Sequence, residues 1–110
     1  MTDLARKKCI PCSGNTPPLT PAKIETLHAQ LPDWEVILGH HLRRVYTCKD
    51  FMAALRLVNR IAEVAETENH HPNISFTWGR VEVEIWTHKI DGLAEADFIL
   101  AAKIDQLPRD

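Results

Sequence analysis

The 110-residue sequence has only three cysteines, no long apolar run and no excess of basic side chains. Three cysteines cannot build a complete disulfide framework, which excludes a disulfide-stapled secreted domain. Short apolar runs and a polar first eight residues give no membrane span or secretory signal, so we expect a cytoplasmic protein without a membrane partner. Lysine and arginine number 13 against 15 acidic residues, and this net charge of −2 argues against direct nucleic-acid binding.

Hydrophobic residues make up 45% and charged residues 25% of the chain, the composition of an ordinary globular protein. At this length one hydrophobic core serves the whole chain, so we expect a single domain. Prolines and cap-forming residues crowd the first twenty positions and prevent any long regular element there. We therefore predict a flexible N-terminal arm over residues 1–19 and one domain over residues 20–110.

Hydrophobic spacing and breaker residues predict three helices and four strands along this domain. The predicted elements are a helix over 21–30, strands over 34–38 and 42–47, a long helix from 51 to about 69, strands over 74–78 and 81–88, and a helix between Gly92 and Pro108. Two separate hairpins favour an antiparallel sheet, and amphipathic helices need a shared apolar surface. The expected fold is α+β, in the order α-β-β-α-β-β-α, with a four-stranded antiparallel sheet and three helices packed on one face.

The long helix carries apolar residues at helical spacing, which predicts that one stripe faces the core. The stripe consists of Phe51, Leu55, Val58, Ala62 and Ala65. Leu57 and Val64 lie away from it, and Leu100 lies away from the main stripe of the last helix, so the helices carry more apolar area than one sheet face covers. Because a four-stranded sheet also has two unpaired edges, we expect a homodimer or homotetramer.

Three of the six histidines, His70, His71 and His88, lie at the ends of predicted elements, where functional side chains often gather. The imidazole of histidine titrates at about pH 6.5, so a group of two or three histidines can hold both an acid and a base at physiological pH. Elimination of water requires such a pair. The sequence therefore predicts a histidine-based acid–base site.

Strand pairing brings these histidines together. A turn at Gly79-Arg80 would place Ile74 opposite Ile85, and His71 would then lie directly opposite His88. Strand alternation puts His88 on the face that carries the strand glutamates, away from the core. We therefore expect the pocket on the open face of the sheet or at its rim.

Two acidic residues can support these histidines. Glu66 precedes His70 by one helical turn, so its carboxylate can orient that ring and raise its basicity. Asp97, in the final segment, can do the same for His88. A second adjacent pair, His40-His41, lies beside a hairpin glycine without comparable partners, and we interpret it as a pair of solvated loop residues.

The candidate residues form a long gapped pattern: Glu66-x-x-x-His70-His71-Pro72, five residues to Trp78, nine to His88 and eight to Asp97. This pattern resembles the signature of the pterin-4a-carbinolamine dehydratases. The resemblance covers about residues 20 to 107, through Leu31-x-x-Trp34, Asp50-Phe51, Asn73-Ile74 and Thr87-His88. Ala94 departs from it, because many relatives carry serine or threonine there, and loss of such a helix cap costs about 1 kcal/mol.

The resemblance implies that 4a-hydroxytetrahydropterin, the product of aromatic amino-acid hydroxylases, loses water to give quinonoid dihydropterin. It also implies that no metal or organic cofactor takes part. His70 and His88 then assist departure of the 4a-hydroxyl group, while His71 binds the pterin and supports catalysis. Trp86 shares the face of His88 and can stack on a flat heterocycle. The expected substrate-binding or supporting residues are Glu66, Pro72, Trp86, Thr87 and Asp97.

Two kinds of metal site are the first alternative. Cys9-Ile10-Pro11-Cys12 has the spacing of half a zinc knuckle, but no second close cysteine pair follows it. A three-histidine site would require His70 and His71 to converge on one ion, although adjacent side chains in an extended chain diverge and Pro72 disfavours a tight turn. We therefore expect no metal.

A non-catalytic protein-binding module is the second alternative. Some members of the resembled family also act as dimerisation cofactors of a homeodomain transcription factor. A pure scaffold would not need the complete set of histidines and carboxylates, so the sequence favours retained catalysis.

Overall fold

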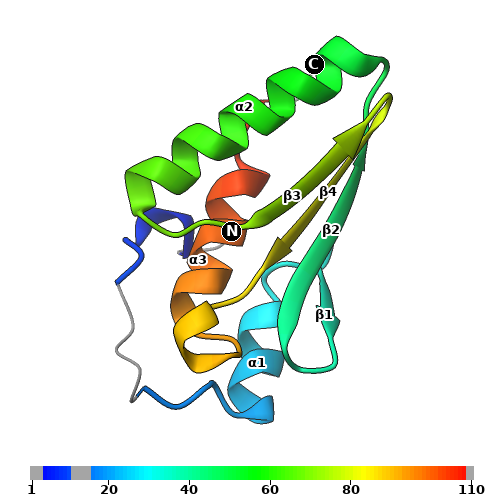
Figure 1. Ribbon diagram of the computed structural model, residues 1–110. Helices are drawn as coiled ribbons and strands as arrows, with labels where there is room; N and C mark the ends of the chain where they lie inside the picture. Colours follow the sequence, from blue (N-terminus) through cyan, green and yellow to red (C-terminus); the bar gives the residue numbers. More distant parts are fainter. Residues whose placement is uncertain (1–3, 11–15, 109–110) are drawn as a thin grey trace.

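The computed structural model describes residues 4–10 and 16–108. Over these residues the chain forms three α-helices, four strands and two short 3-10 helices (Figure 1). Their bounds are η1 Leu4–Arg6, α1 Pro21–His28, β1 Glu35–Ile37, β2 His41–Thr47, α2 Phe51–Glu68, β3 Asn73–Thr77, β4 Arg80–Ile85, η2 His88–Ile90 and α3 Glu95–Asp105. All neighbouring strands run antiparallel in the order β1-β2-β4-β3, which confirms the predicted fold class and element order.

The helix starts follow the sequence signals. Thr20 accepts a hydrogen bond from the Lys23 N–H at 3.3 Å, and Pro21 occupies the first turn of α1, where its missing N–H costs nothing. Asp50 caps α2 by accepting from the Ala53 N–H at 2.8 Å. The helix ends at Asn69, whose φ of 52° is left-handed, and the chain then turns towards β3.

The core lies between one face of the sheet and the helices. Val81, Val83 and Ile85 alternate along β4 with their side chains fully buried, while the intervening residues reach the open face. The last helix, α3, packs against both the sheet and α2, so eight of its eleven residues are buried. Among the described residues, no helix is long and apolar enough to cross a membrane.

The apolar stripe predicted for α2 is wrong in phase. The residues that this helix buries are Ala53, Ala54, Leu57, Ile61 and Ala65. Of the predicted stripe, Phe51 and Ala62 are exposed, Leu55 and Val58 are half-buried, and only Ala65 is fully buried. Leu57 and Leu100, expected to lie outside the core, are buried inside it because α2 and α3 pack against each other there. The exposed apolar surface of α2 therefore includes Phe51 and Met52, and neither Leu57 nor Leu100 contributes to the exposed surface of the helices.

The first described residues do not form a free arm. Leu4 is only 2% exposed and belongs to the hydrophobic core, and the Lys103 ammonium donates to the Ala5 carbonyl at 2.8 Å. The Cys9 N–H donates to Glu68 Oε1 at 2.9 Å, and its thiol donates to the Ala96 carbonyl at 3.4 Å. Within the predicted arm over residues 1–19, Leu4, Ala5 and Cys9 are therefore held against the helices by these contacts, whereas Ile10 is 76% exposed.

Burial raises the pKa of the Cys9 thiol to about 12, and the nearby Glu68 carboxylate adds to this effect. The thiol is therefore protonated at neutral pH, whereas zinc binds the thiolate. Cys12, the other member of the half zinc knuckle, lies outside the described residues. The environment of Cys9 favours a structural role for this cysteine.

The register of the second hairpin differs from the prediction by two residues. Thr77 pairs with Arg80 and Ile74 with Val83, so the two loop residues are Trp78 and Gly79. Gly79 has a φ of 75°, and a Cβ at this position would lie 3.2 Å from the Cys48 carbonyl oxygen, so only glycine fits without strain. In this register β4 runs from Arg80 to Ile85, so Trp86 and His88 lie beyond the end of the strand.

Candidate active site

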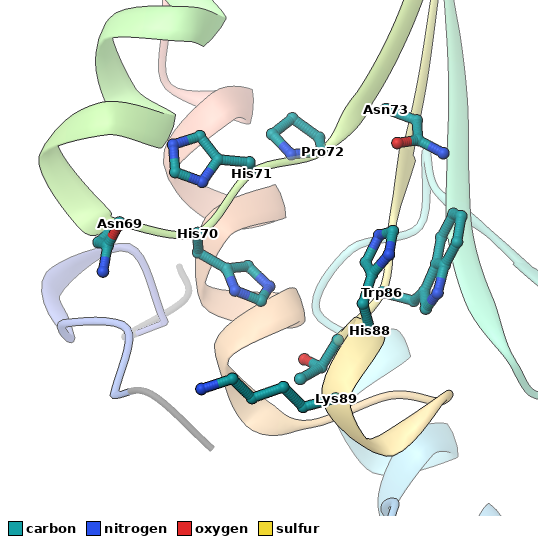
Figure 2. A pocket seen from close by; sticks show the side chains of 9 residues that line it. Asn69, His70, His71, Pro72, Asn73, Trp86, His88 and Lys89 are labelled. Carbon is teal, nitrogen blue, oxygen red and sulfur yellow. The ribbon is translucent and has the colours of Figure 1, made fainter. Parts of the chain in front are cut away.

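A cavity of about 470 Å³ opens where two connecting segments meet at one end of the sheet. Residues 69–73 lead from α2 into β3, and residues 86–89 lead from β4 into η2. Figure 2 shows His70 and His71 on one side of this cavity and Trp86 and His88 on the other. The volume falls within the roughly 300 to 1,000 Å³ that is usual for small-molecule sites.

The backbone fixes both sides of the cavity. On one side, the left-handed Asn69 ends α2 abruptly, and Pro72 keeps the following chain extended. On the other side, an isolated bridge between Thr87 and Gly92 closes a short loop that contains η2. His88 therefore lies on a 3-10 turn rather than at a strand end as predicted, and the cavity lies at the rim of the sheet.

His70 is held by a buried carboxylate. Its Nε2 lies 2.6 Å from Asp97 Oδ1, and Asp97 is completely buried. The other Asp97 oxygen accepts from the Thr87 hydroxyl and from the Ala94 N–H, both at 2.8 Å. Asp97 thus partly replaces the cap that Ala94 cannot provide, and it supports His70 rather than His88, contrary to the sequence prediction.

His71 is held by an exposed carboxylate. Its Nε2 lies 2.5 Å from Glu66 Oε2, and both side chains are more than half exposed. The predicted pair was Glu66 with His70, which would require α2 to continue as far as His70. Because α2 ends at Glu68 and Asn69 is left-handed, His70 lies against Asp97 of α3 and His71 against Glu66.

The ring of His88 stacks on Trp86. Their centroids are 4.4 Å apart and the two planes differ by 10°. Trp86 is partly buried, whereas His88 and the neighbouring Lys89 are exposed at the cavity. Trp86 therefore supports a histidine directly, in addition to lining the cavity as predicted.

His40 and His41 are not solvated loop residues, which corrects the sequence interpretation. Their Nδ1 atoms lie 3.0 Å apart, and both rings contact Trp86 with centroids 5.4 and 5.6 Å away. The pairing of β2 with β4 sets Leu42 beside Ile85, and thereby brings the residues before Leu42 close to Trp86. The contact depends on the pairing of β2 with β4, which the spacing of residues along the chain does not indicate.

A family model described as pterin 4 alpha carbinolamine dehydratase matches residues 17–107. The chain belongs to this family. The match spans both segments of the cavity and all the candidate site residues, and it confirms the family resemblance seen in the sequence.

Similar proteins carry the same family name. Pterin-4-alpha-carbinolamine dehydratase of Rubrobacter xylanophilus is 54% identical over 97% of this chain and 100% of its own length. The protein of that name from Alkaliphilus metalliredigens is 50% identical over 96% of each chain. A crystal structure of a transcriptional coactivator/pterin dehydratase from Brucella melitensis is similar with a TM-score of 0.75 and 29% identity, covering 80% of this chain and 95% of that one.

The cavity of this pterin-4a-carbinolamine dehydratase family member presents imidazoles from two sides. A carboxylate can only accept hydrogen bonds, so the nitrogens that face Asp97 and Glu66 carry hydrogen. In both rings it is therefore Nε2, and not Nδ1, that contacts the carboxylate. Within residues 4–10 and 16–108, no three histidine, cysteine or acidic side chains are grouped as metal ligands.

Proposed function

We propose that this chain removes water from 4a-hydroxytetrahydropterin to give quinonoid dihydropterin, using His70, His71 and His88. The observation that carries the proposal is the convergence of three imidazoles on one cavity in a member of this family. The cavity size suits a bicyclic heterocycle, and Trp86 with His88 offers aromatic surface beside it.

The reaction needs one proton delivered and one removed. The 4a-hydroxyl oxygen receives a proton, the C4a–O bond breaks and water leaves. The N5 lone pair forms the C4a–N5 double bond as water leaves, and the N5 proton then passes to a base, which returns the N–H electron pair to nitrogen. General acid–base assistance typically contributes about 10² to 10⁴ in rate, or about 3 to 5 kcal/mol, which a positioned pair of imidazoles can supply.

His70 and His88 are the proposed proton donors to the departing hydroxyl group, serving opposite C4a stereoisomers, and His71 binds the pterin. Asp97 keeps Nε2 of His70 protonated, so Nδ1 of that ring exchanges the proton. Pro72, Thr87 and Glu66 act indirectly, by holding the extended chain, Asp97 and His71 in place.

Following the absorbance of enzymatically generated 4a-hydroxytetrahydropterin tests this function. With the protein present, the intermediate should decay faster than it does by spontaneous dehydration. If the protein gives no acceleration between pH 6 and 9, the proposal fails and a non-catalytic binding module becomes the better reading. That alternative has support in the description of the Brucella melitensis structure as a coactivator as well as a dehydratase.

Replacing His71 with alanine should raise KM and lower kcat together, because this residue is assigned to binding as well as to catalysis. Its side chain is 55% exposed, so the melting temperature should stay unchanged. Steady-state kinetics and a thermal melt provide both readouts. Normal kinetics together with a large loss of stability would show that His71 is structural.

Self-association and a cytoplasmic location are also part of the proposal. β1 and β3 each pair with one neighbour in the described sheet, which leaves an edge on each. An apolar patch, the α2 patch, lies at the start of α2, where Phe51 is 45% and Met52 54% exposed and the Phe51 ring contacts Phe76 of β3. A cytoplasmic location agrees with the free thiols of Cys9 and Cys48.

Light scattering across a dilution series should give a mass at or above twice 12.5 kDa. Replacing Phe51 with glutamate should shift this association to higher protein concentration, because it places a charge in the α2 patch. The matched control is Glu63→Gln, on an exposed position of the same helix. A monomer at micromolar concentration would refute the self-association.

A further inference from the structure

His40 and His41 form a continuous chain of contacts just outside the cavity. Asp91 Oδ1 lies 2.8 Å from Nε2 of His40, the two Nδ1 atoms lie 3.0 Å apart, and Nε2 of His41 lies 3.4 Å from Glu84 Oε2. The His41 side chain is only 17% exposed and that of His40 32%. The two partly buried imidazoles thus contact each other and two carboxylates, of which Asp91 is 88% and Glu84 33% exposed.

This chain touches the His88 region at two independent points. The first is Trp86, which contacts both imidazoles of the pair and stacks on the ring of His88. The second is Asp91, which ends η2 in a left-handed conformation and whose N–H donates to the His88 carbonyl. The pair therefore contacts both the ring on which His88 stacks and the turn that carries His88.

The hydrogen bonds also indicate which ring nitrogens of His40 and His41 carry hydrogen. The carboxylate of Asp91 accepts, so Nε2 of His40 carries hydrogen. One of the two facing Nδ1 atoms must donate and the other accept, since two N–H groups cannot share one hydrogen bond. An alanine at position 40 removes the ring, the contact with Trp86 and the tether to Asp91 together.

We infer that His40, supported by His41, is a positioning residue for His88 in the dehydration reaction. It acts by fixing the Trp86 indole and the η2 turn, so that the His88 ring meets the substrate in one orientation. This inference rests on the proposed function of His88. Misplacing a catalytic group by about 1 Å can cost on the order of 10²-fold in rate, so a lost support has a measurable effect.

The test combines His40→Ala with alanine at each of the two proposed proton donors. In the His70→Ala background, where turnover depends on His88, His40→Ala should lower kcat by at least about tenfold. In the His88→Ala background it should change kcat by less than about twofold. His40→Gln keeps an N–H donor for Asp91 and should recover part of the loss, and Leu38→Ala is the matched control, since Leu38 is 94% exposed in the same β1–β2 connection.

Equal losses in both backgrounds, or no loss in either, would overturn the inference. If His40→Ala lowers the melting temperature strongly, the comparison is made with His40→Gln, for which the same two outcomes apply. Failure of the proposed function gives a different result, because the protein with both His70 and His88 replaced would then be as active as the unmodified chain.

Discussion

Replacing His70 and His88 together with alanine is expected to reduce dehydration to its spontaneous rate, whereas each single replacement leaves part of the activity. The two rings lie on opposite sides of one cavity, so either can deliver a proton to a hydroxyl group that leaves from its own side. Loss of both removes every proposed donor to that oxygen. The expected loss therefore equals the whole histidine contribution, about 10² to 10⁴ in rate.

The effects should be non-additive, because the two histidines act in parallel. Lys89→Ala is a useful control, since Lys89 is exposed at the same cavity but has no part in the proposed proton transfers. Full activity of the double variant would eliminate the mechanism. A single replacement that abolishes all activity would show that the two rings act in sequence.

Replacing Asp97 with alanine is expected to lower the free energy of unfolding by about 3 kcal/mol. The side chain is fully buried and bonds to the Thr87 hydroxyl, the Ala94 N–H and the His70 ring. Alanine would leave two buried donors without partners and would uncap α3. The same change should lower kcat, because the ring of His70 would lose its orientation.

Denaturant unfolding measures the stability change, and Glu95→Ala is the matched control. Glu95 lies in the same first turn of α3, but it is 44% exposed and pairs with the exposed Lys7, so its loss should cost less than about 1 kcal/mol. Asp97→Asn should fall between the two, since an amide oxygen still accepts hydrogen bonds. An Asp97→Ala protein as stable as Glu95→Ala would contradict the account of this buried carboxylate.

The element order could be predicted from the sequence, but the register of the second hairpin could not. Glycine at position 79 is compatible with a loop of residues 78–79 or of residues 79–80. A shift of the pairing by two residues leaves every side chain on its original face, so the alternation of Val81, Val83 and Ile85 fits both registers. The observed loop is selected by the close approach of the Cys48 backbone, directly after β2, to Gly79.

The core-facing side of α2 was equally undetermined. This helix carries apolar residues on two stripes, and local spacing alone does not tell which one faces the sheet. Contact with the almost wholly buried α3 selects the stripe that contains Leu57 and Ile61. The packing of two helices that are separated by the second hairpin thus decided a question that the local pattern left open.

His70, His71 and His88 line one cavity, but their carboxylate partners differ from the predicted ones: Asp97 contacts His70 rather than His88, and Glu66 contacts His71 rather than His70. The pairings depend on one left-handed residue, Asn69, which directs His70 towards Asp97 and His71 towards Glu66. The contacts of His40 and His41 with Trp86 could not be predicted for a similar reason. Their contacts arise from strands paired across the sheet, and no spacing along the chain encodes them.

The most direct test of the central claim is the observed rate of dehydration as a function of protein concentration, measured by stopped flow near pH 7. The account predicts that this rate rises in proportion to the concentration of the unmodified chain and stays at the spontaneous value with the His70→Ala/His88→Ala protein. A rate that does not depend on the concentration of the unmodified chain would contradict the account.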